Sequence, residues 1–172
     1  MFDFTFKSGD FVGLKAFKHS EFASQETHCY EASVYFNGKR VGVVSNQGHG
    51  GADRWEGDYS VLRDLEARCK TDMPKWSLYD DEEHDTTFEI WCGEQVNRWL
   101  SYRDFKRVMK SKVAFKNPHS DDPEVIRIAS FKNTKKITDR HIRRVMSDVK
   151  DAVVLNLLPE ADAFAMWEVC GE

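Results

Sequence analysis

The spacing of apolar residues predicts β-structure in the first third of the chain. Phenylalanines alternate with polar residues from Phe2 to Phe6, which is typical of a half-buried strand. Two further runs, 28–36 and 40–44, are rich in β-branched and aromatic residues, and Asn37-Gly38 separates them. Because Asn and Gly tolerate positive φ at both central positions of a type I′ turn, these runs predict a β-hairpin.

Apolar spacing changes to the helical period after the hairpin. The apolar residues within 59–69 predict a helix that Asp58 or Ser60 can cap and that Met73-Pro74 ends. Residues 88–100 then place Phe, Trp, Cys, Val and Leu side chains on one helical face. They predict a second, longer helix.

The second half of the chain combines the strand-like and helix-like spacings of apolar residues. The second helix is expected to break near Ser101 and to continue over 105–109. Residues 112–116 and 125–128 alternate as two further strands, and turn-forming residues connect them. Thr138 is expected to cap a short helix that follows.

These elements predict an α+β fold, because the strands cluster instead of alternating with helices. An N-terminal antiparallel, hairpin-based sheet is followed by helices, a second β-hairpin and a C-terminal helix. The apolar run 152–158 fits either a buried strand or the start of a terminal helix, and the tail that follows it either packs internally or contributes to a homodimer contact. A length of 172 residues, with no repeat or long linker, predicts a single compact domain over 1–172.

Composition fits a soluble protein with its own apolar core. The chain is 41% hydrophobic, and no apolar run approaches the roughly 18 residues that cross a bilayer. Its first residues lack the order of a secretory signal, so a cytoplasmic location without membrane contact is expected. The four cysteines form no C-x-x-C pair, which favours reduced, mostly buried thiols at Cys29, Cys69, Cys92 and Cys170.

The glycine-rich loop at 45–53 is the first candidate binding site. It connects a predicted strand to a predicted helix, where successive backbone N–H groups can hold an anion. Its spacing matches neither a P-loop nor a dinucleotide fingerprint, and a tight, exposed turn that needs positive φ is the preferred interpretation of the glycines. In a binding loop, His49 and Arg54 would supply polar contacts to the ligand, and Trp55 would supply a stacking surface. The candidate ligand- or partner-binding residues are Asn46, Gly48, His49, Gly50, Gly51, Arg54 and Trp55.

No motif assigns a catalytic residue, a metal ligand or a cofactor. The acidic run 80–83 with His84 and Asp85 offers metal-ligand types, but H-E-x-x-H and calcium-loop patterns are missing. Acidic residues also suit the positive end of a helix dipole, so a solvated helix start is the preferred interpretation. No G-x-S-x-G elbow supports a serine hydrolase.

Charge is distributed in blocks that nearly cancel to the net charge of −4. Residues 53–97 hold five basic and thirteen acidic side chains, whereas residues 103–144 hold thirteen basic and five acidic ones. The basic block either binds phosphates or folds against the acidic part of the chain. Its candidate phosphate or nucleic-acid contacts are Lys132, Lys135, Lys136, Arg140, Arg143 and Arg144.

Several segments carry a resemblance to a known group of proteins. They are FASQETHCYEA at 22–32, VYFNGK at 34–39, Gly42, SNQGHGG at 45–51 and KVAF at 112–115. The chain resembles small uncharacterised proteins encoded by bacteriophages and related mobile elements. This resemblance implies an accessory role in the infected or host bacterial cell and transfers no catalytic residue.

Three functions are therefore expected as alternatives. The first is a non-enzymatic accessory protein that binds and modulates a host or defence component, such as a counter-defence protein. The second is a nucleic-acid or nucleotide-phosphate binder, with or without hydrolytic activity, that uses the basic segment 103–144 and glycine loop 48–51. The third is a protein that sequesters a signalling nucleotide in the loop. A host protein is the leading partner, and nucleic acid is the alternative.

Overall fold

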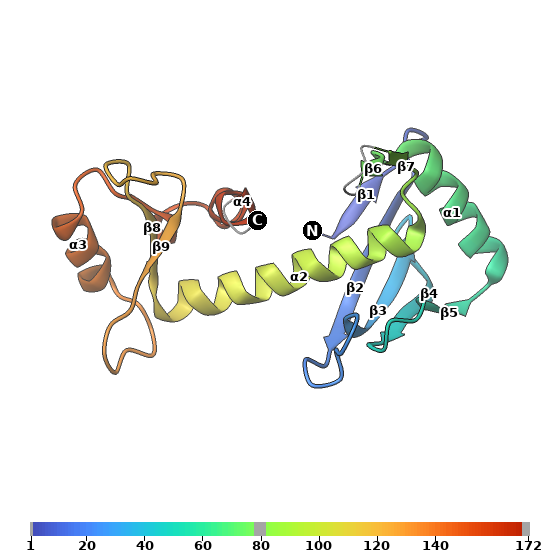
Figure 1. The fold of residues 1–172 in the computed structure, drawn as a ribbon, viewed down its shortest axis with the longest axis horizontal. Coiled ribbons are helices and arrows are strands. Elements are labelled where there is room, and N and C mark those ends of the chain that lie inside the picture. The colour runs from blue at the N-terminus through green and yellow to red at the C-terminus, as the bar shows by residue number, and fades with distance from the viewer. Residues whose placement is uncertain (1, 78–81, 170–172) are drawn as a thin grey trace. The chain divides into compact units, whose positions relative to one another are not determined.

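The computed structural model describes residues 2–77 and 82–169 and confirms the α+β fold (Figure 1). The chain divides into two compact units, Met1–Trp99 (unit 1) and Leu100–Glu172 (unit 2). The boundary falls within helix α2 (Phe88–Ser111), and each unit has its own antiparallel sheet. The single domain expected over 1–172 remains a prediction.

Unit 1 contains a five-stranded antiparallel sheet in which consecutive strands are neighbours. Its strands are β1 (Asp3–Thr5), β2 (Phe11–His19), β3 (Cys29–Phe36), β4 (Lys39–Gln47) and β5 (Arg54–Gly57). The predicted hairpin is β3–β4, and φ is +48° at Asn37 and +78° at Gly38, as a type I′ turn requires. The sequence therefore predicted β1, β3 and β4 but not β2 or β5.

An irregularity explains why β2 was missed. Its pairing with β3 shifts register between Lys15 and Lys18, and Ala16 has a φ of +54°. Val12, Gly13 and Leu14 are buried in succession, so the strand lacks the strict alternation that a sequence pattern can detect. β5 has only four residues and gives too short a pattern.

Helices α1 (Tyr59–Asp72) and α2 pack against this sheet. Asp58 caps α1, since its side chain accepts a hydrogen bond from the Ser60 N–H. Phe88 of α2 contacts Trp55 of β5, and Trp99 stacks on Phe17 of β2 at 5.1 Å between ring centroids. The buried core of unit 1 includes Phe6, Val12, Leu14, Ala32, Val34, Val44, Leu65, Cys69, Trp91, Cys92 and Val96.

Two predictions around α2 were wrong. The helix continues through Ser101 without a break, because its apolar face passes directly to buried Phe105 and no Pro or Gly lies near that position. The acidic run does not start the helix either, since Glu83 lies in β7 (Glu83–His84), paired with β6 (Trp76–Ser77). Residues 80 and 81 of that run lie outside the described residues.

Unit 2 contains a three-stranded sheet in the order β10-β8-β9. Strands β8 (Val113–Lys116) and β9 (Ile126–Ala129) form the second predicted hairpin, and α3 (Asp139–Asp148) follows its N-cap Thr138. The apolar tail is shared among β10 (Val153–Val154), a 3-10 turn (Leu155–Leu157) and α4 (Glu160–Val169). The run 152–158 is therefore part strand and part 3-10 turn, and the terminal helix begins after it, at Glu160.

Alternation along β8 divides the apolar side chains of unit 2 into two clusters. Ala114 packs with Phe105, Leu155 and Phe164. On the other face, Val113 and Phe115 lie in a cluster that includes Ile142, Val145 and Val154. Much of the C-terminal tail thus packs inside unit 2.

The described cysteines are free thiols, as predicted. Cys69 and Cys92 are buried, and burial raises the pKa of Cys69 to about 12 and that of Cys92 well above its usual range. Cys170 lies outside the described residues. Of the helices within residues 2–77 and 82–169, none is long and apolar enough to cross a membrane.

Candidate binding pocket

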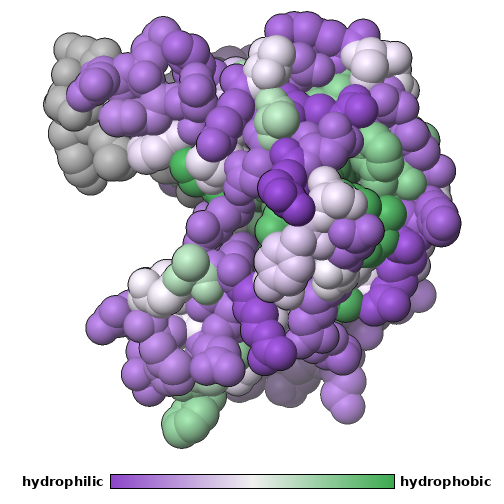
Figure 2. Space-filling model, turned by 90° about the vertical axis from the view of Figure 1, so that its right-hand side faces the viewer, coloured by the Kyte–Doolittle hydropathy of each residue, from purple (hydrophilic) through white to green (hydrophobic). Residues whose placement is uncertain are grey.

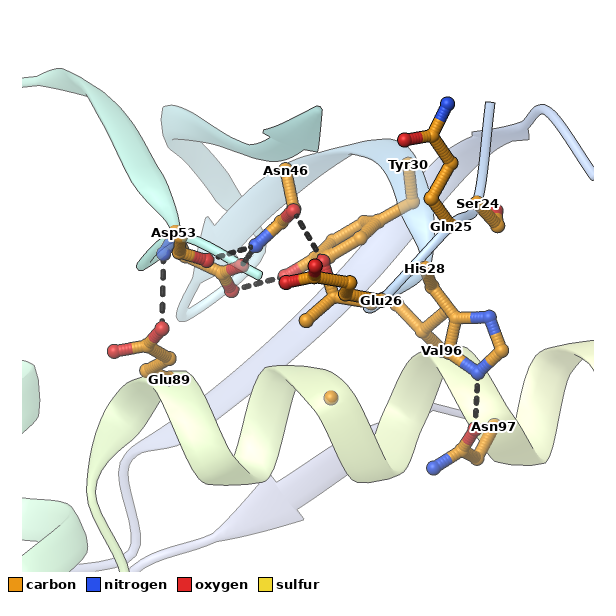
Figure 3. Close-up of a pocket in the computed structure, with 13 residues that line it drawn as sticks. Ser24, Gln25, Glu26, His28, Tyr30, Asn46, Asp53, Glu89, Val96 and Asn97 are labelled. Atoms are coloured by element: carbon orange, nitrogen blue, oxygen red, sulfur yellow. Dashed lines mark hydrogen bonds between the residues drawn. The ribbon is translucent and has the colours of Figure 1, made fainter. Parts of the chain in front are cut away.

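A pocket of about 480 Å³ lies in unit 1, between two loops, the sheet and α2 (Figure 3). The loop between β2 and β3 contributes residues 24–28. Tyr30 of β3 and Asn46 of β4 form the sheet side, and Gly51 and Asp53 come from the glycine-rich loop. Helix α2 closes the pocket with Glu89, Gly93, Val96 and Asn97.

The two loops are joined through the carbonyl of Gly48. It accepts hydrogen bonds from the N–H groups of Gln25 at 2.9 Å, Glu26 at 3.0 Å and Thr27 at 3.5 Å. Gly48 has a φ of +86°, which glycine adopts without strain, and a Cβ at this position would lie only 2.1 Å from the Ala23 carbonyl oxygen. The glycine-rich loop is therefore an ordered wall of the pocket and not only a solvent-exposed turn.

Asn46 connects the components of this wall. Its Oδ1 accepts hydrogen bonds from the Gly48 N–H and the Thr27 hydroxyl, each at 2.8 Å. Its Nδ2 donates to the Gly51 carbonyl at 2.8 Å and to Asp53 Oδ1 at 3.0 Å. The side-chain amide thus uses both its donors and its acceptor within the loop.

Asp53 is the half-buried acid of the pocket. Its Oδ2 accepts a hydrogen bond from the Tyr30 hydroxyl, and its N–H donates to Glu89 Oε1 at 2.9 Å (Figure 3). Burial raises the pKa of Asp53, and the charge of Glu89 acts in the same direction. Burial also raises the pKa of Tyr30, so its phenol remains protonated and donates to the carboxylate.

His28 lies at the other end of the pocket. Its Nε2 is 2.7 Å from Asn97 Oδ1, and because this oxygen can only accept, Nε2 carries the proton. The Ser24 hydroxyl donates to the Ser20 carbonyl at 2.7 Å and accepts from the Cys29 N–H at 2.8 Å. Ser24 is therefore engaged in the loop, and its geometry is that of a turn residue.

The pocket is acidic and rich in hydrogen-bond acceptors. Glu26, Asp53 and Glu89 are among its thirteen lining residues, and none of the thirteen is Lys or Arg. The N–H groups of Gly48 and Gly50 are engaged by Asn46 Oδ1 and Thr27 Oγ1, respectively. This arrangement disfavours a phosphate and favours a cation or another donor-rich group.

Comparisons with protein-family models, with curated proteins and with solved structures found no match. The chemistry of the pocket is therefore inferred from its own residues. Within the two described ranges, no group of three or more His, Cys, Asp or Glu side chains is arranged to hold a metal ion.

The loop residues singled out from the sequence take different places. Asn46 and Gly51 line the pocket, whereas Arg54 pairs with Glu56 at 3.4 Å outside the lining. Trp55 is only 7% exposed and packs on Phe88, so its expected role as a stacking surface was wrong. His49 Nδ1 lies 3.3 Å from Gln25 Oε1, and Gly48 and Gly50 shape the loop.

The sequence interpretation missed the opposite wall. Residues 24–28, Tyr30 and Glu89 belong to the pocket but carry no familiar motif. The uninterrupted polar run from Ser24 to His28, directly before a strand, was the available signal. The six candidate cations all belong to unit 2, where they are exposed: Lys132, Lys135, Lys136, Arg140, Arg143 and Arg144.

Proposed function

We propose that the protein is a non-enzymatic accessory protein of a bacteriophage or related mobile element that binds and modulates a host or defence component. Its pocket in unit 1 would receive a cationic group of that partner, such as a lysine or arginine side chain. The observation that carries this proposal is the presence of three carboxylates and no Lys or Arg in the lining. The resemblance to phage proteins supports the biological setting, the cytoplasm of the infected or host bacterial cell.

The geometry of the acids suits a guest with several N–H donors. One oxygen of Glu89 accepts the Asp53 N–H, which leaves its second oxygen for a ligand. Glu26 is exposed on the joined loops. Charge-assisted hydrogen bonds from a guanidinium or ammonium group to such carboxylates are stronger than neutral ones, and a wall that is already ordered lowers the entropic cost of binding.

An exposed aromatic side chain on a pocket-lining loop would add one apolar contact to this recognition. Phe22 is 99% exposed and lies on the same loop, two residues before Ser24. The face drawn in Figure 2 is mainly hydrophilic, with hydrophobic side chains in limited patches. Aromatic residues, Phe included, are enriched in protein interfaces.

Reversing the charge of Glu26 tests this function. The Glu26→Lys variant should bind the partner about tenfold more weakly, because a lysine would repel the incoming cation. Tagged wild-type and variant proteins are used to capture partners from host lysate at several salt concentrations, and affinities for the captured protein are then measured. Glu21→Lys is the matched control, since Glu21 is an exposed acid of the same loop outside the lining.

Two results would contradict the proposal. One is the absence of any reproducible partner of the wild-type protein. The other is a partner that binds Glu26→Lys and Glu21→Lys equally well, which would place recognition outside the pocket.

A second candidate function is nucleic-acid binding by unit 2. Helix α3 buries Ile142 and Val145 and exposes Arg140, Arg143 and Arg144, so the helix presents cations on its outer face. The segment before it adds Lys132, Lys135 and Lys136, all exposed. Arg144 also pairs with Asp148 at 2.8 Å, but a phosphate can compete with an exposed pair of this kind.

Short DNA and RNA test this second function. Binding should weaken steeply between about 50 and 200 mM salt, because each phosphate contact releases counterions. Changing Lys136, Arg140 and Arg143 to Gln should weaken it further, whereas the same change at the exposed unit-1 lysines Lys15, Lys18 and Lys39 should not. Absence of binding at low salt would exclude this candidate.

A further inference from the structure

A second pocket, of about 340 Å³, lies in unit 1 and shares no lining residue with the first. Both pockets use α2, but through different residues. Glu89, Val96 and Asn97 line the first pocket, whereas Trp91 and Gln95 line the second. Because successive helical residues are about 100° apart, these residues point to different sides of the helix.

The second pocket is lined by five aromatic or apolar side chains and six polar or charged ones. Trp91 is 3% exposed and Met73 is 6% exposed, and Phe4 and Trp76 are half-buried. Aromatic and apolar side chains combined with convergent polar groups are typical of small-molecule sites of this volume. Indole rings provide flat surfaces on which a planar guest can stack.

One polar side chain in this lining has an unsatisfied atom. Gln95 is 8% exposed, and its Oε1 is sealed from solvent without a hydrogen-bond partner. A buried acceptor without a donor is unfavourable. The terminal torsion of glutamine is soft, so the amide can turn toward a guest without movement of α2. A guest with an adjacent donor and acceptor could pair with both atoms of the amide.

The charges of the lining balance one another. Asp3 and Glu94 contribute two acids, and Lys75 and Arg98 contribute two bases. This lining gives no electrostatic preference for either a cation or an anion. It differs in this respect from the first pocket, which is acidic.

We propose that this pocket binds a neutral, planar heteroaromatic base of the adenine type. The ring stacks on the half-buried indole of Trp76, and its edge, an amino N–H next to a ring nitrogen, pairs with the amide of Gln95. Glutamine makes the same bidentate pair with adenine in nucleic-acid recognition, and aromatic side chains stack on bases of any kind.

The test compares adenine with N6,N6-dimethyladenine, which lacks the amino N–H donors. Both are titrated into the full chain, and the NMR signals of the Trp indole N–H and Gln side-chain amide groups are followed. We expect adenine to shift the signals of Trp76, Trp91 and Gln95 and to bind about tenfold more tightly than the dimethylated base.

Gln95→Met distinguishes hydrogen bonding to the Gln95 amide from the steric effect of the added methyl groups. Methionine has a similar volume and favours helices, so α2 is retained, and the variant should bind the two purines with similar affinity. If the extra methyl groups act only by size, the tenfold preference will persist in Gln95→Met, which would overturn the pairing with Gln95. Absence of any shift at millimolar adenine would overturn the site itself.

Trp76→Leu is a second test variant, and its result does not depend on whether Gln95→Met folds. It should weaken both purines at least fivefold and preserve their ratio, because stacking is common to both. Unchanged binding in this variant would contradict the stacking wall. Glu26→Lys, which changes the first pocket, should leave adenine binding unaltered, so the two proposals can fail separately.

Discussion

Gly48→Ala is expected to lower the free energy of unfolding by about 2–5 kcal/mol. An added Cβ would lie 2.1 Å from the Ala23 carbonyl oxygen, which is a backbone atom and cannot rotate away. The φ of +86° would strain any L-residue in addition. The measurement is urea unfolding followed by Trp fluorescence, which reports mainly on unit 1 because four of the five tryptophans belong to it: Trp55, Trp76, Trp91 and Trp99.

The same loop offers graded controls. At Gly51 no heavy atom lies within 4 Å of an added Cβ, and its φ is not in the left-handed region, so Gly51→Ala should change stability by no more than about 0.5 kcal/mol. Gly50→Ala should cost about 1–2 kcal/mol, because its φ is +80° but the nearest obstacle is the end of the flexible Glu26 side chain. Equal stabilities of the three variants would contradict the loop arrangement described above.

Local chemistry explains which elements could be predicted from sequence. The β3–β4 hairpin and the Asp58 cap of α1 each depend on a short segment with one favoured backbone geometry. Strand β2 could not be predicted in the same way, because its bulge near Ala16 is stabilised by pairing with β3, which begins ten residues after β2 ends. The break expected at Ser101 failed because burial of Phe105 outweighs the weak helix propensity of serine.

The candidate pocket, like the fold, could be predicted only in part from the sequence. The glycine-rich loop was recognisable, since glycines at 48 and 50 indicated positive φ, and both adopt it. Its function as an anion cradle could not be judged, because the partners of its N–H groups depend on the side chain of Thr27, from another loop. Asp53 and Glu89 are 36 positions apart, and only the packing of α2 brings them together.

Asn46→Asp is expected to destabilise unit 1 by about 3 kcal/mol at pH 7, and the loss should depend on pH. The amide Nδ2 that donates to Gly51 and Asp53 becomes a carboxylate oxygen, so two acids face each other where a 3.0 Å hydrogen bond existed. Burial already raises the pKa of Asp53 above its ordinary value of 3.8, and a second carboxylate must raise it further. Unfolding curves of wild type and variant over a range of pH measure the effect.

The sign of this pH dependence follows from proton binding. A carboxyl whose pKa is higher in the folded protein binds its proton more tightly there, so the stability it contributes falls as pH rises from 3.8 through the folded pKa. Asn46→Asp should therefore regain stability between about pH 7 and pH 4, because a shared proton restores one hydrogen bond between the two acids. Asn46→Ala removes the same hydrogen bonds without adding a charge, so its deficit relative to wild type should not shrink in this way. Two outcomes would contradict this expectation: a loss of stability in Asn46→Asp that stays constant across this pH range, or one that equals the loss in Asn46→Ala at every pH. Either would show that Asn46 and Asp53 do not form the contact on which this wall of the pocket depends.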